Sequence, residues 1–180
     1  CGASQANAQA PAPLEAGKHY TLISPAQPTS TDPGKVEVTE VFMFGCPGCF
    51  SFEPHIQNWL TTKADYINFV RIPAPWNPMA ILHARAFYTA EALGKGDEID
   101  GPFFTEFHVN GNYLDSEAKI AAFFEKHGVD KATFTSTFNS FAVNAKLKRA
   151  EELIRRYRVQ STPTVIVNGK YIATGQQAGS

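Results

Sequence analysis

Val41-Phe42-Met43-Phe44-Gly45-Cys46-Pro47-Gly48-Cys49-Phe50-Ser51-Phe52-Glu53 is a stretch in which a strand pattern passes directly into a helix pattern, with two cysteines at the junction. Residues 36–44 are rich in β-branched and aromatic side chains, which is typical of a central strand. Residues 47–60 continue as a helix whose apolar side chains form one stripe: Phe52, Ile56, Trp59 and Leu60. Pro54 removes a backbone donor and is expected to kink this helix. The sequence therefore places Cys46 where a strand ends and a helix begins.

That position favours thiol chemistry at Cys46. Thiol–disulfide exchange needs a thiolate, and the unpaired N–H groups and positive dipole end of a helix N-terminus stabilise the anion. Pro47 fits the first helical turn, where its missing N–H leaves nothing unpaired. Cys49 lies one turn further, where it is expected to be deeper and to act as the resolving thiol. The two-residue gap brings the two sulfurs within bonding reach.

Strand patterns on either side extend the fold outward. Residues 67–72 form the next strand and complete a β–α–β unit. Residues 19–23 are a short strand candidate before a Pro-rich loop. Near the end, residues 164–167 and 170–173 flank Asn168-Gly169, the dipeptide most typical of a tight hairpin. Between the third strand and this hairpin the pattern is helical, and glycines divide it into pieces at about 79–93, 98–109, 115–127, 130–138 and 143–157.

Composition bounds the class of protein. The chain has 180 residues, 43% hydrophobic and 18% charged, and its 16 Lys and Arg against 17 Asp and Glu give a net charge of −1. This balance is ordinary for a globular domain and offers no support for binding nucleic acid. No apolar run is long enough to cross a bilayer.

The third cysteine, Cys1, opens a segment without hydrophobic periodicity, so residues 1–17 are expected to be a flexible tail. A chain that begins at Cys1 followed by Gly2 resembles a processed bacterial lipoprotein, acylated on that cysteine. The alternative is a plain stretch of tail left after removal of a signal peptide. Both favour an exported protein in an oxidising compartment.

Two segments carry a resemblance to a known family. The stretch 41–53 resembles the active-site strand and helix of the periplasmic DsbA family. Ser161-Thr162-Pro163-Thr164-Val165-Ile166-Val167-Asn168-Gly169-Lys170-Tyr171 is similar to that family's cis-proline segment and hairpin. Residues 90–94 and 138–141 resemble its helical insertion, and the likeness extends from about residue 18 to the end.

The resemblance implies an α/β thioredoxin fold with an inserted α-helical domain between the third strand and the cis-proline hairpin. The domains expected are a flexible tail over 1–17, a thioredoxin-like domain over 18–75 plus 158–180, and a helical domain over 76–157. Two features depart from the family pattern. Gly48 stands where the family most often has His, so a milder oxidant is expected, and the chain ends at Ser180, before the family's usual closing helix.

The resemblance also implies site residues. Pro163 is expected to be cis and to lie opposite the cysteines. Thr162 then offers its backbone to a substrate strand, with Pro47 and Gly48 as further substrate contacts. Glu40 shares strand parity with apolar residues and resembles the family's buried acid, which exchanges a proton with Cys49. An end-of-strand Glu that reaches solvent is the alternative.

Arg71, on the neighbouring strand, is the expected charge partner of Glu40. Glu53 is interpreted as a solvated helix residue with a secondary tuning role. A metal site is not expected: His55 could be a third ligand beside the cysteines, but no fourth ligand has suitable spacing. The other histidines are interpreted as surface or helix-end residues: His19, His83, His108 and His127.

The leading hypothesis is a protein disulfide oxidoreductase that donates the Cys46–Cys49 disulfide to cysteine pairs of newly exported, unfolded proteins through a Cys46 mixed disulfide. The resemblance implies a periplasmic monomer, a membrane-bound quinone-linked reoxidase of the DsbB type as partner, and no cofactor beyond the cysteine pair. Within the same chemistry a periplasmic reductase or isomerase is the alternative. From another class, a peptide- or metal-binding module with an inert C-x-x-C remains.

Overall fold

The computed structural model describes residues 13–177. Cys1, with the lipid anchor expected there, and most of the expected tail therefore lie outside the described residues. In the described part of the chain no helix is both long enough and apolar enough to cross a membrane.

One mixed five-stranded sheet forms the centre of the molecule. Its strands are, in spatial order, β1 (Thr21–Leu22), β5 (Tyr171–Thr174), β4 (Thr164–Val167), β2 (Val36–Phe42) and β3 (Ile67–Pro73). β2 and β3 are parallel, and the other neighbouring pairs are antiparallel. The parallel pair is the β–α–β unit expected from the sequence, because β2 and β3 are joined through the helix that follows the cysteines.

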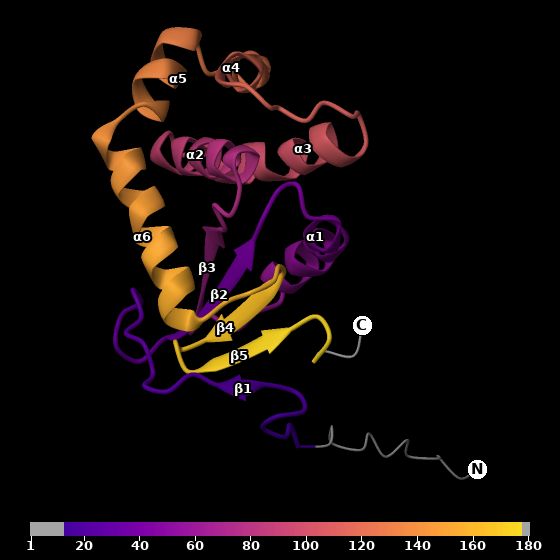
Figure 1. Ribbon diagram of the computed structural model, residues 1–180, viewed down its shortest axis with the longest axis vertical. Coiled ribbons are helices and arrows are strands. Elements are labelled where there is room, and N and C mark those ends of the chain that lie inside the picture. Colours follow the sequence, from indigo (N-terminus) through magenta and orange to yellow (C-terminus); the bar gives the residue numbers. More distant parts are fainter. Residues whose placement is uncertain (1–12, 178–180) are drawn as a thin grey trace, which may run out of the picture.

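Within residues 13–177, six helices pack around the sheet. They are α1 (Pro47–Leu60), α2 (Pro78–Ala92), α3 (Gly96–His108), α4 (Glu117–Lys126), α5 (Lys131–Phe138) and α6 (Phe141–Tyr157). Figure 1 shows α1 and α6 on opposite flanks of the sheet, while α2 to α5 cross one end of it. All of α2 to α6 lies between β3 and the β4–β5 hairpin, as expected of a helical insertion.

An aromatic core joins the insertion to the sheet. Phe44 follows β2, is almost fully buried, and has ring centroids 4.2 Å from Phe103 and 4.9 Å from Phe104 of α3. Phe42 packs edge-on against Phe44 at 5.1 Å. Buried aromatic pairs contribute about 0.5–1.5 kcal/mol beyond the area they bury. This packing fixes α3 next to the segment that carries the cysteines.

Several boundaries differ from the sequence prediction, each for a local reason. β2 ends at Phe42 rather than residue 44, because the chain turns there and the N–H of Cys46 donates to the carbonyl of Met43 at 3.1 Å. α6 begins two residues early because Ser140 caps it through the N–H of Val143. The hairpin turn is confirmed: Asn168 and Gly169 both have positive φ, at 50° and 60°.

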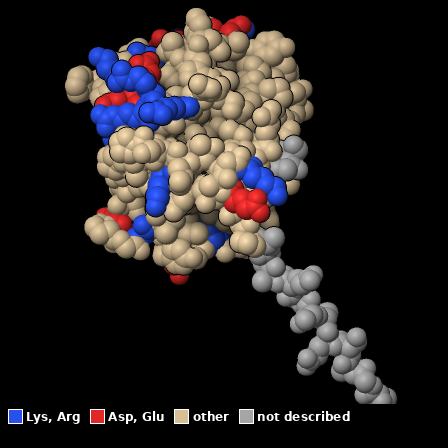
Figure 2. Space-filling model, turned by 60° about the horizontal axis from the view of Figure 1, so that its bottom comes forward, with Lys and Arg blue, Asp and Glu red and all other residues tan. Residues whose placement is uncertain are grey.

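Charged side chains are unevenly spread over the surface. Figure 2 shows Lys and Arg gathered on the flank that α6 covers, with acidic side chains among them. Several are ion-paired, including Lys146 with Glu91 at 2.8 Å and Arg156 with Glu152. The charge visible in this view is thus concentrated across the sheet from α1.

Candidate active site

Cys46 is the N-cap of α1. Its backbone is extended, with φ −88° and ψ 117°, and the N–H of Cys49 donates to its Sγ across 3.4 Å. Pro47 occupies the start of the helix, where no N–H is required. The first N–H groups of a helix have no acceptor within the helix, and the sulfur of Cys46 accepts from one of them. It also faces the positive end of the helix dipole.

The two cysteines, both free thiols, have different environments. Cys49 is 0% exposed, whereas Cys46 is only partly buried. The thiol of Cys49 is the main stabiliser of the Cys46 thiolate, followed by Thr162 and then by backbone N–H groups; together they outweigh burial and lower the pKa of Cys46 from 9.0 to about 5. The hydrogen bond with Cys46, followed by burial, raises the pKa of Cys49. The pair therefore carries one exposed thiolate and one buried thiol, as nucleophile and resolving group require.

The segment with Pro163 lies directly against the cysteines. The Thr162–Pro163 peptide bond is cis, as the resemblance implies. The Thr162 carbonyl oxygen lies 3.4 Å from Cys46 Sγ. A Cβ added to Gly48 would stand 3.2 Å from Pro163 Cδ and 3.7 Å from Cys46 Sγ. The structure thus brings the six predicted residues of the 46–49 and 162–163 segments into one site.

A groove opens beside this site. Its volume is about 510 Å³, and α1, Pro163 and the β4–β5 hairpin line it with mainly apolar surface. Phe52 and His55 project into it from α1, while Ala173 and Thr174 contribute from β5. Gly48 and Pro163, which flank Cys46, are among the residues that line this groove.

Glu40 is fully buried, at 0% exposed, so the alternative in which its side chain reaches solvent is wrong. It stands opposite Arg71 in the β2–β3 register, and Arg71 Nε donates to Glu40 Oε2 at 2.9 Å. Burial raises the pKa of Glu40, and Arg71 opposes that rise. The charge partner predicted for Glu40 is confirmed.

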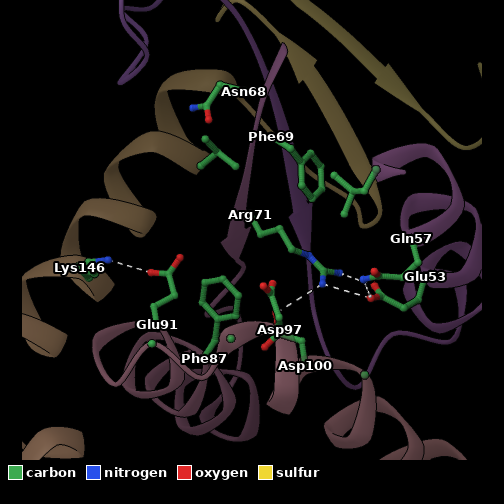
Figure 3. Close-up of a pocket in the computed structure, with 15 residues that line it drawn as sticks. Glu53, Gln57, Asn68, Phe69, Arg71, Phe87, Glu91, Asp97, Asp100 and Lys146 are labelled. Atoms are coloured by element: carbon green, nitrogen blue, oxygen red, sulfur yellow. Dashed lines mark hydrogen bonds and ion pairs between the residues drawn. The ribbon is translucent and has the colours of Figure 1, made fainter. Parts of the chain in front are cut away.

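The interpretation of Glu53 as a solvated residue is wrong. Glu53 is only 8% exposed, and its Oε2 accepts from Arg71 Nη2 at 2.6 Å (Figure 3). The buried face of α1 runs through Cys49, Glu53 and Ile56, one residue away from the stripe read from Phe52. Glu53 follows Cys49 by four residues, and residues at this spacing lie on the same face of a helix. Because Cys49 was already expected to be deep, this spacing could have predicted that Glu53 is buried.

Three residues of α3 near the site were missed by sequence reasoning. Asp100 Oδ2 lies 3.5 Å from Arg71 Nη1. His108 Nε2 lies 2.7 Å from the carbonyl of Phe44, and the Phe107 ring stands where a Cβ on Gly45 would come within 3.2 Å. His108 and Phe107 contact the turn that precedes Cys46, whereas Asp100 contacts Arg71 of β3. Nothing in the sequence fixes how α3 docks, so no local signal pointed to them.

His83 corrects a further expectation, because it is 3% exposed rather than on the surface. Its Nε2 lies 3.0 Å from the carbonyl of Tyr113, and burial lowers its pKa. Across residues 13–177 no three His, Cys, Asp or Glu side chains are grouped as a metal ion would need.

The strands and helices follow one another in the order of a thioredoxin fold, and a free cysteine pair at the N-terminus of the first long helix faces a cis-proline. These features define a thiol:disulfide oxidoreductase of the thioredoxin class. Residues 77–179 match the model of the DSBA-like thioredoxin domain. The chain is 40% identical over 169 residues to the thiol:disulfide interchange protein DsbA of Pseudomonas syringae pv. tomato, covering 92% of this chain and 77% of that protein. It is 36% identical to the DsbA of Burkholderia cepacia, with 94% and 79% covered.

Solved structures agree. The crystal structure of Pseudomonas aeruginosa DsbA matches with a TM-score of 0.87 at 37% identity, covering 93% of this chain and 86% of that one. The DsbA of Xylella fastidiosa matches with a TM-score of 0.85 at 30% identity, covering 90% and 88%. The chain belongs to the DsbA family, and it has that family's thioredoxin fold with a helical insertion.

Proposed function

We propose that this oxidoreductase works as a donor of disulfides: oxidised Cys46–Cys49 passes its bond to cysteine pairs of unfolded, newly exported proteins. The observation that carries the proposal is the asymmetry of the pair, in which the pKa of Cys46 falls to about 5 while that of Cys49 rises. A thiolate that is stable when the site is reduced makes the oxidised site a ready oxidant.

The reaction has two exchanges. A substrate thiolate attacks Cys46 Sγ, the Cys46–Cys49 bond breaks, and Cys49 departs with the electron pair and takes up a proton. The second substrate thiolate then attacks its partner sulfur in the mixed disulfide, and Cys46 leaves as a thiolate. The substrate loses two electrons and the enzyme gains them, so the cysteine pair needs no further cofactor.

The neighbouring residues have distinct roles in these steps. Thr162 and cis Pro163 present backbone to an extended substrate next to Cys46, and the apolar groove beyond Gly48 receives the side chains that follow. Pro47 fixes the helix start that stabilises the thiolate. Glu40, buried and paired with Arg71, supplies the proton that Cys49 takes up.

Membership of the DsbA family supports a proposal for the surroundings of the enzyme. It acts in the periplasm as a monomer, and a quinone-linked membrane protein of the DsbB type restores its disulfide. Acylation of Cys1 would anchor the chain to a membrane. Neither nucleic acid nor metal takes part.

The test is oxidation of a reduced, unfolded protein by the oxidised enzyme. The loss of free thiols from the substrate is measured. We expect Cys46→Ala to abolish oxidation. Reduced Cys49→Ala, given a protein that contains a disulfide, should attack that bond through Cys46 and accumulate the Cys46 mixed disulfide, which non-reducing gels detect. Oxidation that survives Cys46→Ala would contradict the proposal and favour an inert C-x-x-C.

A further inference from the structure

The guanidinium of Arg71 pairs with three buried carboxyl groups where the sheet, α1 and α3 meet. Arg71 of β3 contacts Glu40 of β2 at 2.9 Å, Glu53 of α1 at 2.6 Å and Asp100 of α3 at 3.5 Å. Figure 3 shows Glu53 and Asp100 directed at Arg71 from different elements. If all three carboxylates were ionised, one positive and three negative charges would leave the cluster at −2. Buried, uncompensated charge is costly, so the cluster retains a proton near neutral pH.

The hydrogen bonds indicate which carboxyl groups hold that proton. Both oxygens of Glu53 are occupied: Gln57 Nε2 donates to Oε1 at 2.8 Å, and Arg71 Nη2 donates to Oε2. Glu53 is therefore the carboxyl group whose two oxygens both accept hydrogen bonds. Glu40 Oε1 and Asp100 Oδ1 are buried and, within residues 13–177, have no hydrogen-bond partner. These two oxygens are the places in the cluster where a proton displaces no hydrogen bond.

Only one of these two carboxyl groups adjoins a solvent cavity. Glu40 is 0% exposed, whereas Asp100 lines an open cavity of about 770 Å³ between α1, β3, α2 and α3. Two further acids face this cavity, Asp97 from α3 and Glu91 from α2, and Glu91 is paired with Lys146 of α6. Of Glu40 and Asp100, Asp100 is thus the carboxyl group that can exchange a proton with water.

We propose that Asp100 is a positioning residue of the redox reaction, which shares one proton with Glu40 across Arg71 and exchanges it with water in the adjoining cavity. When Cys49 departs as a thiolate, Glu40 gives it the proton, and Asp100 returns a proton to Glu40 from solvent. This role rests on the proposed function and adds a residue to it.

Electrostatics within the cluster support this role. Burial is the largest cause that raises the pKa of Asp100, from 3.8 to about 7, and Arg71 opposes it. Burial also raises the pKa of Glu40, and negative charge on Glu53 and on Cys46 adds to that rise. Glu40 and the active-site sulfur therefore respond to each other's charge, and in the proposed exchange the ionisation of Asp100 acts on the Cys46 thiolate through Glu40.

The test compares the equilibrium of the active-site disulfide with glutathione, from about pH 5.5 to 8.5, in the full chain and three variants. Asp100→Asn removes the titrating carboxyl without changing its size. Asp100→Glu restores a carboxyl, and Asp97→Asn removes an exposed carboxyl from the same helix. The readout is the ratio of each variant's equilibrium constant for reduction to that of the wild type.

At low pH Asp100 is neutral, so the Asp100→Asn ratio is expected to be near one. It should rise roughly three- to tenfold by pH ~8.5, which corresponds to a charge effect of about half to one pKa unit at an exchangeable buried site. The Asp97→Asn ratio should stay flat, and Asp100→Glu should follow the wild type.

Parallel profiles for Asp100→Asn and the wild type would overturn the role of Asp100, and so would equal effects of Asp100→Asn and Asp97→Asn. Neither result would affect the proposed function, because exchange through Cys46 would persist. Loss of substrate oxidation in the wild type itself would instead refute that function.

Discussion

We predict that a histidine in place of Gly48 makes the site more oxidising. A side chain at residue 48 begins 3.7 Å from Cys46 Sγ, so an imidazolium would lie about 5 Å from the thiolate. At an effective dielectric constant of about 20 the attraction is roughly 3 kcal/mol, and solvent at this exposed turn reduces it to about half. The remaining ~1.4 kcal/mol corresponds to one pKa unit and to about 30 mV of reduction potential.

The assay is equilibration of Gly48→His with glutathione buffers at about pH 6 and pH 8.5. The potential should rise by about 30 mV at the lower pH and by less at the higher, because a free imidazole loses its proton near pH ~6.5. Gly48→Ala is the matched control: it adds only the Cβ, 3.2 Å from Pro163 Cδ. Equal potentials for the His and Ala variants at both pH values would refute the electrostatic reasoning.

Three further predictions concern stability, each measured by urea unfolding. Arg71→Met leaves three buried carboxyl groups, which share one proton, without their cation. It should cost about 3–5 kcal/mol at pH ~7 but less in acid, where the carboxyl groups are protonated; an equal loss at both pH values would contradict the cluster. The pKa of Asp100 is raised to about 7, so the free energy of unfolding of the wild type should fall as pH rises from about 4 to 7. Asp100→Asn should reduce that fall by at most about 4 kcal/mol. An unchanged dependence of the unfolding free energy on pH would contradict the raised pKa. Gly169→Ala should cost more than about 2 kcal/mol, because its Cβ would lie 2.1 Å from the Gln27 carbonyl oxygen. Gly34→Ala, which is also at positive φ but in open space, should cost less. Similar losses of stability for the two variants would exclude the steric explanation.

Local patterns were sufficient for the parts of the site that lie on continuous elements. The strand-to-helix junction at Cys46, the Asn168-Gly169 turn and the pairing of Glu40 with Arg71 all follow from residues adjacent in sequence or in register. The cis bond at Pro163 needed the family resemblance, because X-Pro bonds are usually trans.

Residues whose role depends on how helices dock could not be predicted in this way. Glu53 is a charged residue on a face that becomes buried only because Arg71 reaches it from β3. Asp100 follows two acidic residues in the first turn of α3, where charges normally favour the helix dipole and face water. Its burial depends on the aromatic packing that sets α3 against Phe44.

The reduction potential of the Cys46–Cys49 disulfide, measured in the full chain against graded glutathione buffers, is the most direct test of the proposed direction of exchange. If the Cys46 thiolate is as stable as its contacts indicate, the potential should lie well above the roughly −270 mV of thioredoxin. A potential at or below that value would contradict disulfide donation and make the protein a reductase.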